Sequence, residues 1–173
     1  MKDDIVPIHG QGFFTVSRRG EFYQIVRYDY YDPEGYYVKV LKSPTLYNEE
    51  ISKLASNMQS FIDSEKVIVN GLQVKPKVLM VNIEHSGFEE YPHITFLIYF
   101  KGKLTNGINV FENVYEECVA EYDYEVYWVF PPRTKILEVE VSGDFDVVGN
   151  ILYIWARRGD RIKGYEKIVF QFS

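Results

Sequence analysis

The chain has 173 residues, a net charge of −6 and one cysteine, Cys118. This length suits one domain over residues 1–173, with a division into 1–75 and 76–173 as the alternative. The acidic balance argues against a nucleic-acid binder or a binder of anionic membranes, because both need a positive face. No internal disulfide can form, and residues 1–30 lack the pattern of a signal peptide, so we expect an intracellular, cytoplasmic protein.

The composition favours a sheet protein. Val, Ile, Tyr, Phe and Trp together make up 64 of the 173 residues, while Ala occurs three times. Branched and aromatic side chains fit a pleated surface, and alanine is the best helix former. Many Tyr, Lys, Glu, Val and Ile residues would also suit a thermophile. No apolar run approaches the roughly 20 residues that span a bilayer, so no membrane segment is expected.

The first elements in chain order are strands. Residues 13–17 and 21–31 are predicted to form a hairpin, with Gly20 in the left-handed position of its turn. Asp32, Pro33 and Gly35 then carry the signature of a type I turn. A third strand is predicted over residues 36–41.

One amphipathic helix is predicted over residues 48–66, where the apolar period changes to that of a helix. Asn48 would cap its start. Met58 and Phe61 would lie buried against a sheet face. The apolar stripe consists of Ile51, Leu54, Ala55, Met58, Phe61 and Ile62.

The rest of the chain predicts a sandwich. Asn70-Gly71 indicates a tight hairpin between residues 67–69 and 72–74. Seven strands should follow, at residues 78–85, 93–101, 109–118, 121–130, 135–142, 151–156 and 165–172. We therefore predict a mainly β fold: an antiparallel β-sandwich, immunoglobulin-like in strand count, with one amphipathic helix packed on it.

Alternation along two of these strands predicts which side chains face the core. In residues 121–130 the inner set is Tyr122, Tyr124, Val126, Trp128 and Phe130, and in residues 135–142 it is Leu137, Val139 and Val141. Pro131-Pro132 would either turn a hairpin between the two strands or carry the chain to the second sheet. The sequence leaves both options open.

The residues around two of the histidines argue against a metal site. His85 and His93 lie close to Glu84, Glu89 and Glu90, which looks at first like a ligand cluster. Strand alternation places His85 and His93 on opposite faces, unless a bulge intervenes. We therefore predict neither a metal nor any other cofactor.

Three other candidate sites have simpler explanations. Cys118 follows Glu116 and Glu117, which is not the electropositive setting that a nucleophilic cysteine needs, and its alternation predicts a buried thiol. The stripe of Glu121, Asp123 and Glu125 could bind Ca²⁺ only if a loop added ligands, so a solvated face that discourages edge pairing is favoured. The basic turns could hold phosphate groups but are better explained as solubilising turns; they contain Arg18, Arg19, Arg157, Arg158, Arg161, Lys163 and Lys167.

Tyrosines next to the first turn are the candidate binding residues. They are Tyr28, Tyr30, Tyr31, Tyr36 and Tyr37. Tyrosine works well at contact surfaces, although a tyrosine-lined core is the alternative. No catalytic motif is present, so the leading hypothesis is a non-enzymatic module that binds a protein partner or itself through exposed aromatics. A carbohydrate-binding module is the first alternative. An enzyme with two dispersed carboxylates in a cleft is the second.

Overall fold

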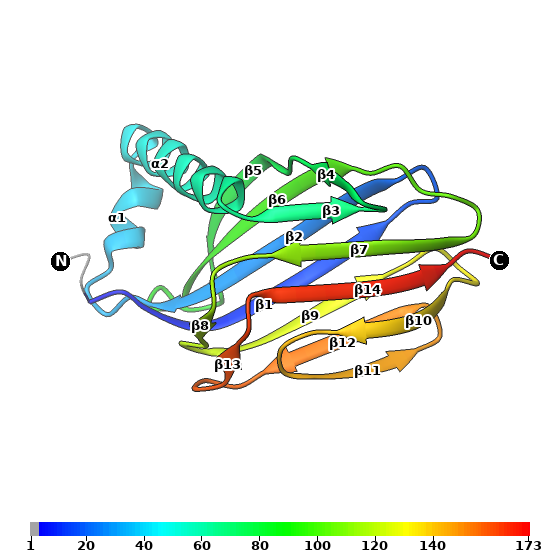
Figure 1. Ribbon diagram of the computed structural model, residues 1–173. Helices are drawn as coiled ribbons and strands as arrows, with labels where there is room; N and C mark the ends of the chain where they lie inside the picture. The colour runs from blue at the N-terminus through cyan, green and yellow to red at the C-terminus, as the bar shows by residue number, and fades with distance from the viewer. Residues whose placement is uncertain (1–3) are drawn as a thin grey trace.

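The computed structural model, which describes residues 4–173, is a β-sandwich with two helices (Figure 1). One sheet has seven strands in the order β11 (Asp144–Val148), β12 (Ile151–Ala156), β9 (Asp123–Val129), β1 (Val6–Val16), β2 (Glu21–Tyr31), β6 (Pro92–Lys101) and β5 (Lys77–His85). The other has five, in the order β10 (Lys135–Glu140), β14 (Tyr165–Gln171), β7 (Ile108–Val114), β3 (Lys66–Val69) and β4 (Leu72–Val74). A two-stranded ribbon joins β8 (Cys118–Val119) to β13 (Arg161–Ile162).

Strand pairing mixes distant parts of the chain. Every paired strand of the described residues runs antiparallel to its neighbour except β1 and β9, which are parallel. Each large sheet contains strands from both sides of residue 75, so residues 1–75 and 76–173 share both layers. The mainly β sandwich is therefore as predicted, with one parallel pair within it.

Aromatic side chains fill the space between the sheets. Phe22, Phe100 and Trp128 from the large sheet contact Phe111 from the small one, with ring centroids 4.8–6.2 Å apart. These four side chains are at most 2% exposed. Burying each such ring stabilises the fold by roughly 1.5–3 kcal/mol, so this layer sets the spacing of the sheets.

Two helices cover the part of the large sheet that the small sheet leaves open. α1 (Tyr36–Lys42) and α2 (Pro44–Asp63) lie over β5 and β6, on the same side as the small sheet (Figure 1). Val40 and Ile62 from the helices pack with Ile83, Ile94 and Phe96 in a second core cluster. Neither helix in the described part of the chain is long and apolar enough to cross a bilayer.

The strand predicted at residues 36–41 is wrong, because this segment forms α1. The Asp32 carboxylate accepts hydrogen bonds from the backbone N–H groups of Tyr36 and Tyr37, at 3.0 and 2.8 Å. These bonds satisfy donors that a helix start leaves free. Gly35, with φ of 64°, turns the chain into the helix. The branched residues favour a strand locally, but packing on the sheet decides the outcome.

The main helix begins earlier than predicted and turns one large side chain outward. Ser43 caps α2 by accepting a hydrogen bond from Leu46 N, and Pro44 follows at the first helical position, where proline fits best. The stripe packs on the sheet with one exception: Phe61 is 57% exposed while Ile62 is 7% exposed. The burial predicted for Phe61 is therefore wrong; Met58 packs against the second core cluster as expected.

Local irregularities explain two further differences. Leu137, predicted to face inward, is 49% exposed because the register of β10 shifts between Ile136 and Glu138. Cys118, predicted to be buried, is exposed because the strand predicted at 109–118 ends at Val114 and Cys118 belongs to the β8 ribbon. Pro131-Pro132 carries the chain from the large sheet to the small one, which settles the open choice.

The two tight turns agree with the sequence. Gly20 has φ of 81° in the β1–β2 turn, as its left-handed role requires. Asn70 and Gly71 have φ of 50° and 77°, the pair of positive values that a type I′ hairpin needs.

Candidate functional site

The large sheet has one face that neither the small sheet nor the helices cover, and we call it the outer face. Alternation from the buried Phe22, Phe96 and Trp128 identifies the side chains that point to it. Across its middle runs a band of large apolar side chains, here named the outer belt. The outer belt consists of Phe13, Tyr23, Ile25, Met80, Leu97, Tyr99, Tyr127, Tyr153 and Trp155.

Strand register holds the outer belt together. Phe13 is paired with Ile25 on one side and with Tyr127 on the other, and Tyr127 is paired with Tyr153. Phe13, Tyr23, Ile25 and Met80 are 41–51% exposed. Such residues lose solvent contact only if something outside the described chain covers them.

The aromatic rings of the outer belt stand against one another. Tyr127 and Tyr153 are stacked with centroids 4.8 Å apart, and Tyr153 and Trp155 with centroids 4.9 Å apart. Tyr23 and Tyr99 are 5.0 Å apart. Stacked neighbours hide their ring faces from solvent and present mainly their edges.

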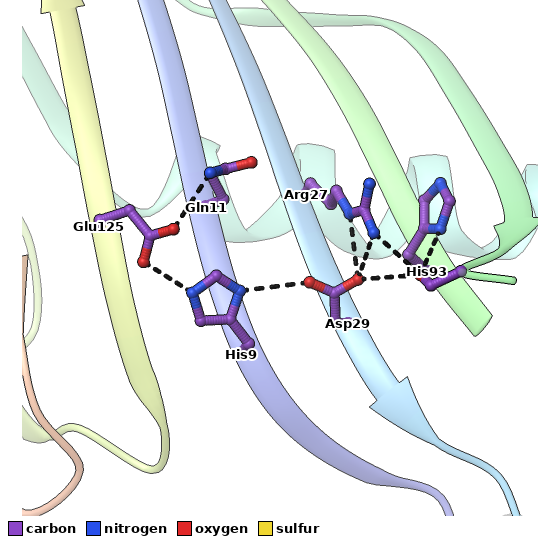
Figure 2. Close-up of polar contacts among 7 residues, drawn as sticks. His9, Gln11, Arg27, Asp29, His93 and Glu125 are labelled. Atoms are coloured by element: carbon purple, nitrogen blue, oxygen red, sulfur yellow. Dashed lines mark hydrogen bonds and ion pairs between the residues drawn. The ribbon is translucent and has the colours of Figure 1, made fainter. Parts of the chain in front are cut away.

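A polar network borders the outer belt (Figure 2). His9 lies between two carboxylates: its Nε2 is 2.6 Å from Glu125 Oε2 and its Nδ1 is 3.2 Å from Asp29 Oδ2. The Arg27 guanidinium donates to Asp29 at 2.7 Å. The network thus ties β9, β1 and β2 together side by side.

The network continues to the end of β6. Arg27 also donates to the hydroxyl of Ser86 at 2.9 Å, and that hydroxyl lies 3.0 Å from His93 Nδ1. Ser86 also reaches Asp29 at 3.3 Å. The Ser86 hydroxyl lies between a guanidinium, a carboxylate and an imidazole, and these three contacts restrain its orientation.

Charges in the network shift the acid–base behaviour of its members. Burial alone would lower the pKa of His9, but the hydrogen bonds to Glu125 and Asp29 outweigh it and raise the pKa. Burial opposes ionisation of Asp29, yet Arg27 and His9 hold the pKa of its carboxyl below the ordinary value. Burial and Arg27 lower the pKa of His93. His9 is therefore the imidazole that carries charge more readily.

The predicted acidic stripe is split between partners. Glu125 belongs to the network, while Asp123 pairs with Arg157 at 3.1 Å and accepts a hydrogen bond from Arg158 N. β9 lies inside the sheet between β12 and β1, so the stripe does not protect an edge as expected. Glu125 instead holds His9, and Asp123 holds the loop that contains Arg157 and Arg158.

The two candidate metal-binding histidines separate as expected. The register pairs Glu84 with His93 and His85 with Pro92, which puts the histidines on opposite faces. No group of three or more His, Cys, Asp or Glu side chains in residues 4–173 is arranged to hold a metal ion.

The tyrosines predicted as binding residues divide between core and surface. Tyr37 is 5% exposed, and Tyr28, Tyr30 and Tyr36 pack against the second core cluster. Tyr31 is 40% exposed and lies beside Tyr91. The hydroxyl of Tyr36 donates to Glu50 at 2.9 Å. These five residues do not share one exposed platform.

A shallow groove lies between α1 and α2, close to these tyrosines. It has a volume of about 350 Å³ and is lined by Tyr36, Lys39, Val40, Leu46, Glu49, Glu50 and Lys53. Two lysines and two glutamates are among its lining residues, so the groove does not favour a ligand of one charge.

Two half-buried carboxylates, Glu166 and Glu65, point toward the space between the sheets. Glu166 shares the inward face of β14 with Ile168 and Phe170, and Tyr115 donates to it at 3.2 Å. Glu65 accepts from Asn113 at 3.0 Å. Burial raises the pKa of Glu166 to about 7; the Tyr115 hydrogen bond opposes this rise and Glu65 adds to it. Burial also raises the pKa of Glu65.

Several of the basic residues in the turns have specific contacts. Arg161 pairs with Glu117 at 2.7 Å and Lys167 with Glu138 at 2.9 Å. The Arg18 guanidinium lies 4.8 Å from the centre of the Phe172 ring. These contacts fit ordinary structural roles for the three side chains.

The outer belt and the network could not be predicted from the sequence, each for its own reason. β12 reads as an apolar run on both faces, so alternation does not separate Tyr153 and Trp155 from the core residues beside them. The network depends on the parallel pairing of β1 with β9, which brings His9 to Glu125 across 116 residues. The alternation of His9, Gln11, Phe13 and Thr15 along β1 was the one available signal.

Comparison with known proteins gives little guidance. No family model matches the chain, and no curated protein is similar to it. A solved structure of a putative protease from Parabacteroides distasonis is similar over 98% of this chain, with 8% identity and a TM-score of 0.34. The chain spans 41% of the length of that protein.

Proposed function

We propose that this chain is a non-enzymatic interaction module that binds a protein partner through its outer face. The observation that carries the proposal is the outer belt, which lies on the sheet face away from the small sheet and in which Phe13, Ile25 and Met80 are 43–51% exposed. A contiguous apolar patch rimmed by polar groups is typical of a protein contact surface. An intracellular, cytoplasmic location is part of this proposal, and a free exposed thiol at Cys118 fits a reducing compartment.

The polar network supports the same function. Its side chains are already hydrogen-bonded to one another, so little conformational entropy is lost when a partner docks beside them. Charges at the rim of an interface add specificity and orientation rather than bulk affinity.

Carbohydrate binding is the second candidate, because hydrogen-bonding side chains lie next to aromatic rings. A sugar stacks on an exposed ring face. In the outer belt, Tyr127, Tyr153 and Trp155 use their faces on one another, which favours a protein partner.

The test is affinity capture from the native extract with three forms of the chain: wild type, Ile25→Glu and Phe61→Glu. Ile25 lies in the centre of the outer belt, and Phe61 is an equally apolar exposed side chain on α2. We expect the Ile25 variant to lose a partner that both other forms retain. A partner retained by all three forms would contradict the proposal, and binding on a glycan array that Ile25→Glu abolishes would support the carbohydrate alternative instead.

A further inference from the structure

The outer face has the size of a standard protein interface. Seven strands about 4.8 Å apart and four rows of outward side chains about 6.8 Å apart cover roughly 800 Å². A stable complex buries about 800 Å² on each partner. A partner that covers this face must itself offer a broad and nearly flat apolar surface.

Charge is distributed unevenly along β5 and β6, at one side of this face. Lys77 and Lys101 lie at one end of the strand pair, with Lys75 and Lys103 in the adjoining loops. Glu84 lies at the other end, followed by Glu89 and Glu90 in the connecting turn. All seven side chains are exposed. The face is therefore positive at one end of this strand pair and negative at the other.

This charge pattern is self-complementary in one of two symmetric arrangements. When two copies stack face to face with their strands antiparallel, β5 lies over β5, and the lysine end of each copy covers the glutamate end of the other. When the two-fold axis runs along the strands instead, the strands are parallel and β5 lies over β11 of the other copy, so the lysine end no longer faces the glutamate end. A two-fold axis in the plane of the face, perpendicular to the strands, gives the favourable arrangement.

We infer that the partner of the outer face is a second copy of this chain, stacked antiparallel so that the outer belts cover each other and Glu84 of each copy faces Lys77 of the other. This inference rests on the proposed function and names the occupant of the same surface. Stacked sheets pack about 10 Å apart with their side chains interdigitated, as the two inner faces of one sandwich do.

The experiment is sedimentation equilibrium of the full chain at concentrations up to about 100 μM, where a dimer of micromolar affinity is mostly assembled. Wild type and Phe61→Glu should be dimers, and Ile25→Glu should be a monomer. Circular dichroism checks that each variant is folded; Phe13→Glu replaces Ile25→Glu if that variant is not.

A charge-swap cycle tests the antiparallel arrangement. Lys77→Glu and Glu84→Lys should each weaken the dimer by about tenfold, because each places like charges opposite one another twice in a two-fold dimer. The double variant restores opposite charges and should recover most of the lost affinity. If the dimer affinity of the double variant is reduced by the sum of the two single losses in free energy, the antiparallel arrangement is overturned.

The outcomes separate this inference from the proposed function. A wild-type monomer throughout the concentration range overturns the dimer, while the proposed function survives if Ile25→Glu still loses a captured partner. A dimer that Ile25→Glu leaves intact places the contact elsewhere and also overturns the inference.

Discussion

Replacing Glu166, a half-buried acid on the inward side of β14, with glutamine should remove a pH dependence of stability. The carboxyl points toward the space between the sheets, and its pKa rises from 4.5 to about 7. The folded state therefore binds the proton more tightly than the unfolded state does. For the wild type, the contribution of this group to stability is full below pH 4.5 and is lost as the pH rises through about 7.

The size of the loss follows from the two pKa values. Each pKa unit corresponds to 1.36 kcal/mol, so the wild type should lose about 3 kcal/mol from this group between pH 4 and pH 8. Glutamine does not titrate, and its amide oxygen can still accept the hydrogen bond of Tyr115. The stability of Glu166→Gln relative to wild type should therefore increase by about 3 kcal/mol over that range.

Urea unfolding at pH 4.5, 6 and 8 measures this difference directly. The matched control is Glu140→Gln, which changes an exposed glutamate on the neighbouring strand β10 and should leave the pH profile unaltered. Parallel pH profiles for Glu166→Gln and wild type would show that the carboxyl is hydrated, and would refute the reasoning.

Three further predictions concern single side chains. Gly20→Ala places a Cβ against the backbone carbonyl oxygen of Gly102, whereas Gly71→Ala meets nothing within 4 Å, although both have positive φ. Thermal unfolding should show a loss of about 1 kcal/mol for Gly71→Ala and a clearly larger loss for Gly20→Ala; equal losses would contradict this. Phe61→Ala should cost less than about 1 kcal/mol and Ile62→Ala about 2–5 kcal/mol, and the reverse order would mean that α2 is rotated. Because the pKa of His9 is raised in the folded state, its stabilising effect is full below pH 6.5 and is lost as the pH rises above its pKa in the folded state. His9→Gln should therefore flatten the dependence of the melting temperature on pH in that range. An unchanged slope would argue against the pairing of His9 with the two carboxylates.

Patterns within one element could be read from the sequence. The Asn70-Gly71 turn is fixed by local backbone preferences, and the sandwich class follows from the abundance of branched and aromatic residues. The apolar stripe of α2, from Ile51 to Ile62, repeats over about three turns of a 20-residue helix, so its existence was clear while its exact start and rotation were not.

Features that depend on distant partners could not be read. Helix α1 has a strand-like composition and forms because the Asp32 carboxylate caps it and the sheet packs under Tyr37 and Val40. The outer face was hidden because strands with apolar residues on both sides give no alternation, so Tyr153 and Trp155 resembled core residues. Two exposed aromatics, Phe13 and Tyr23, lie on the outer belt, and others such as Phe88 lie outside it.

The parallel pairing of β1 with β9 also bears on synthesis of the chain. β1 is an early strand, yet one of its two neighbours in the sheet, Asp123–Val129, leaves the ribosome more than a hundred residues later. Until then the nascent hairpin of β1 and β2 displays an unpaired strand edge with Phe13 and Phe14 on it. Such an edge invites pairing with other chains, and late closure of a distant strand pair slows folding. The edge of the N-terminal hairpin therefore stays open to wrong pairing until β9 has been made.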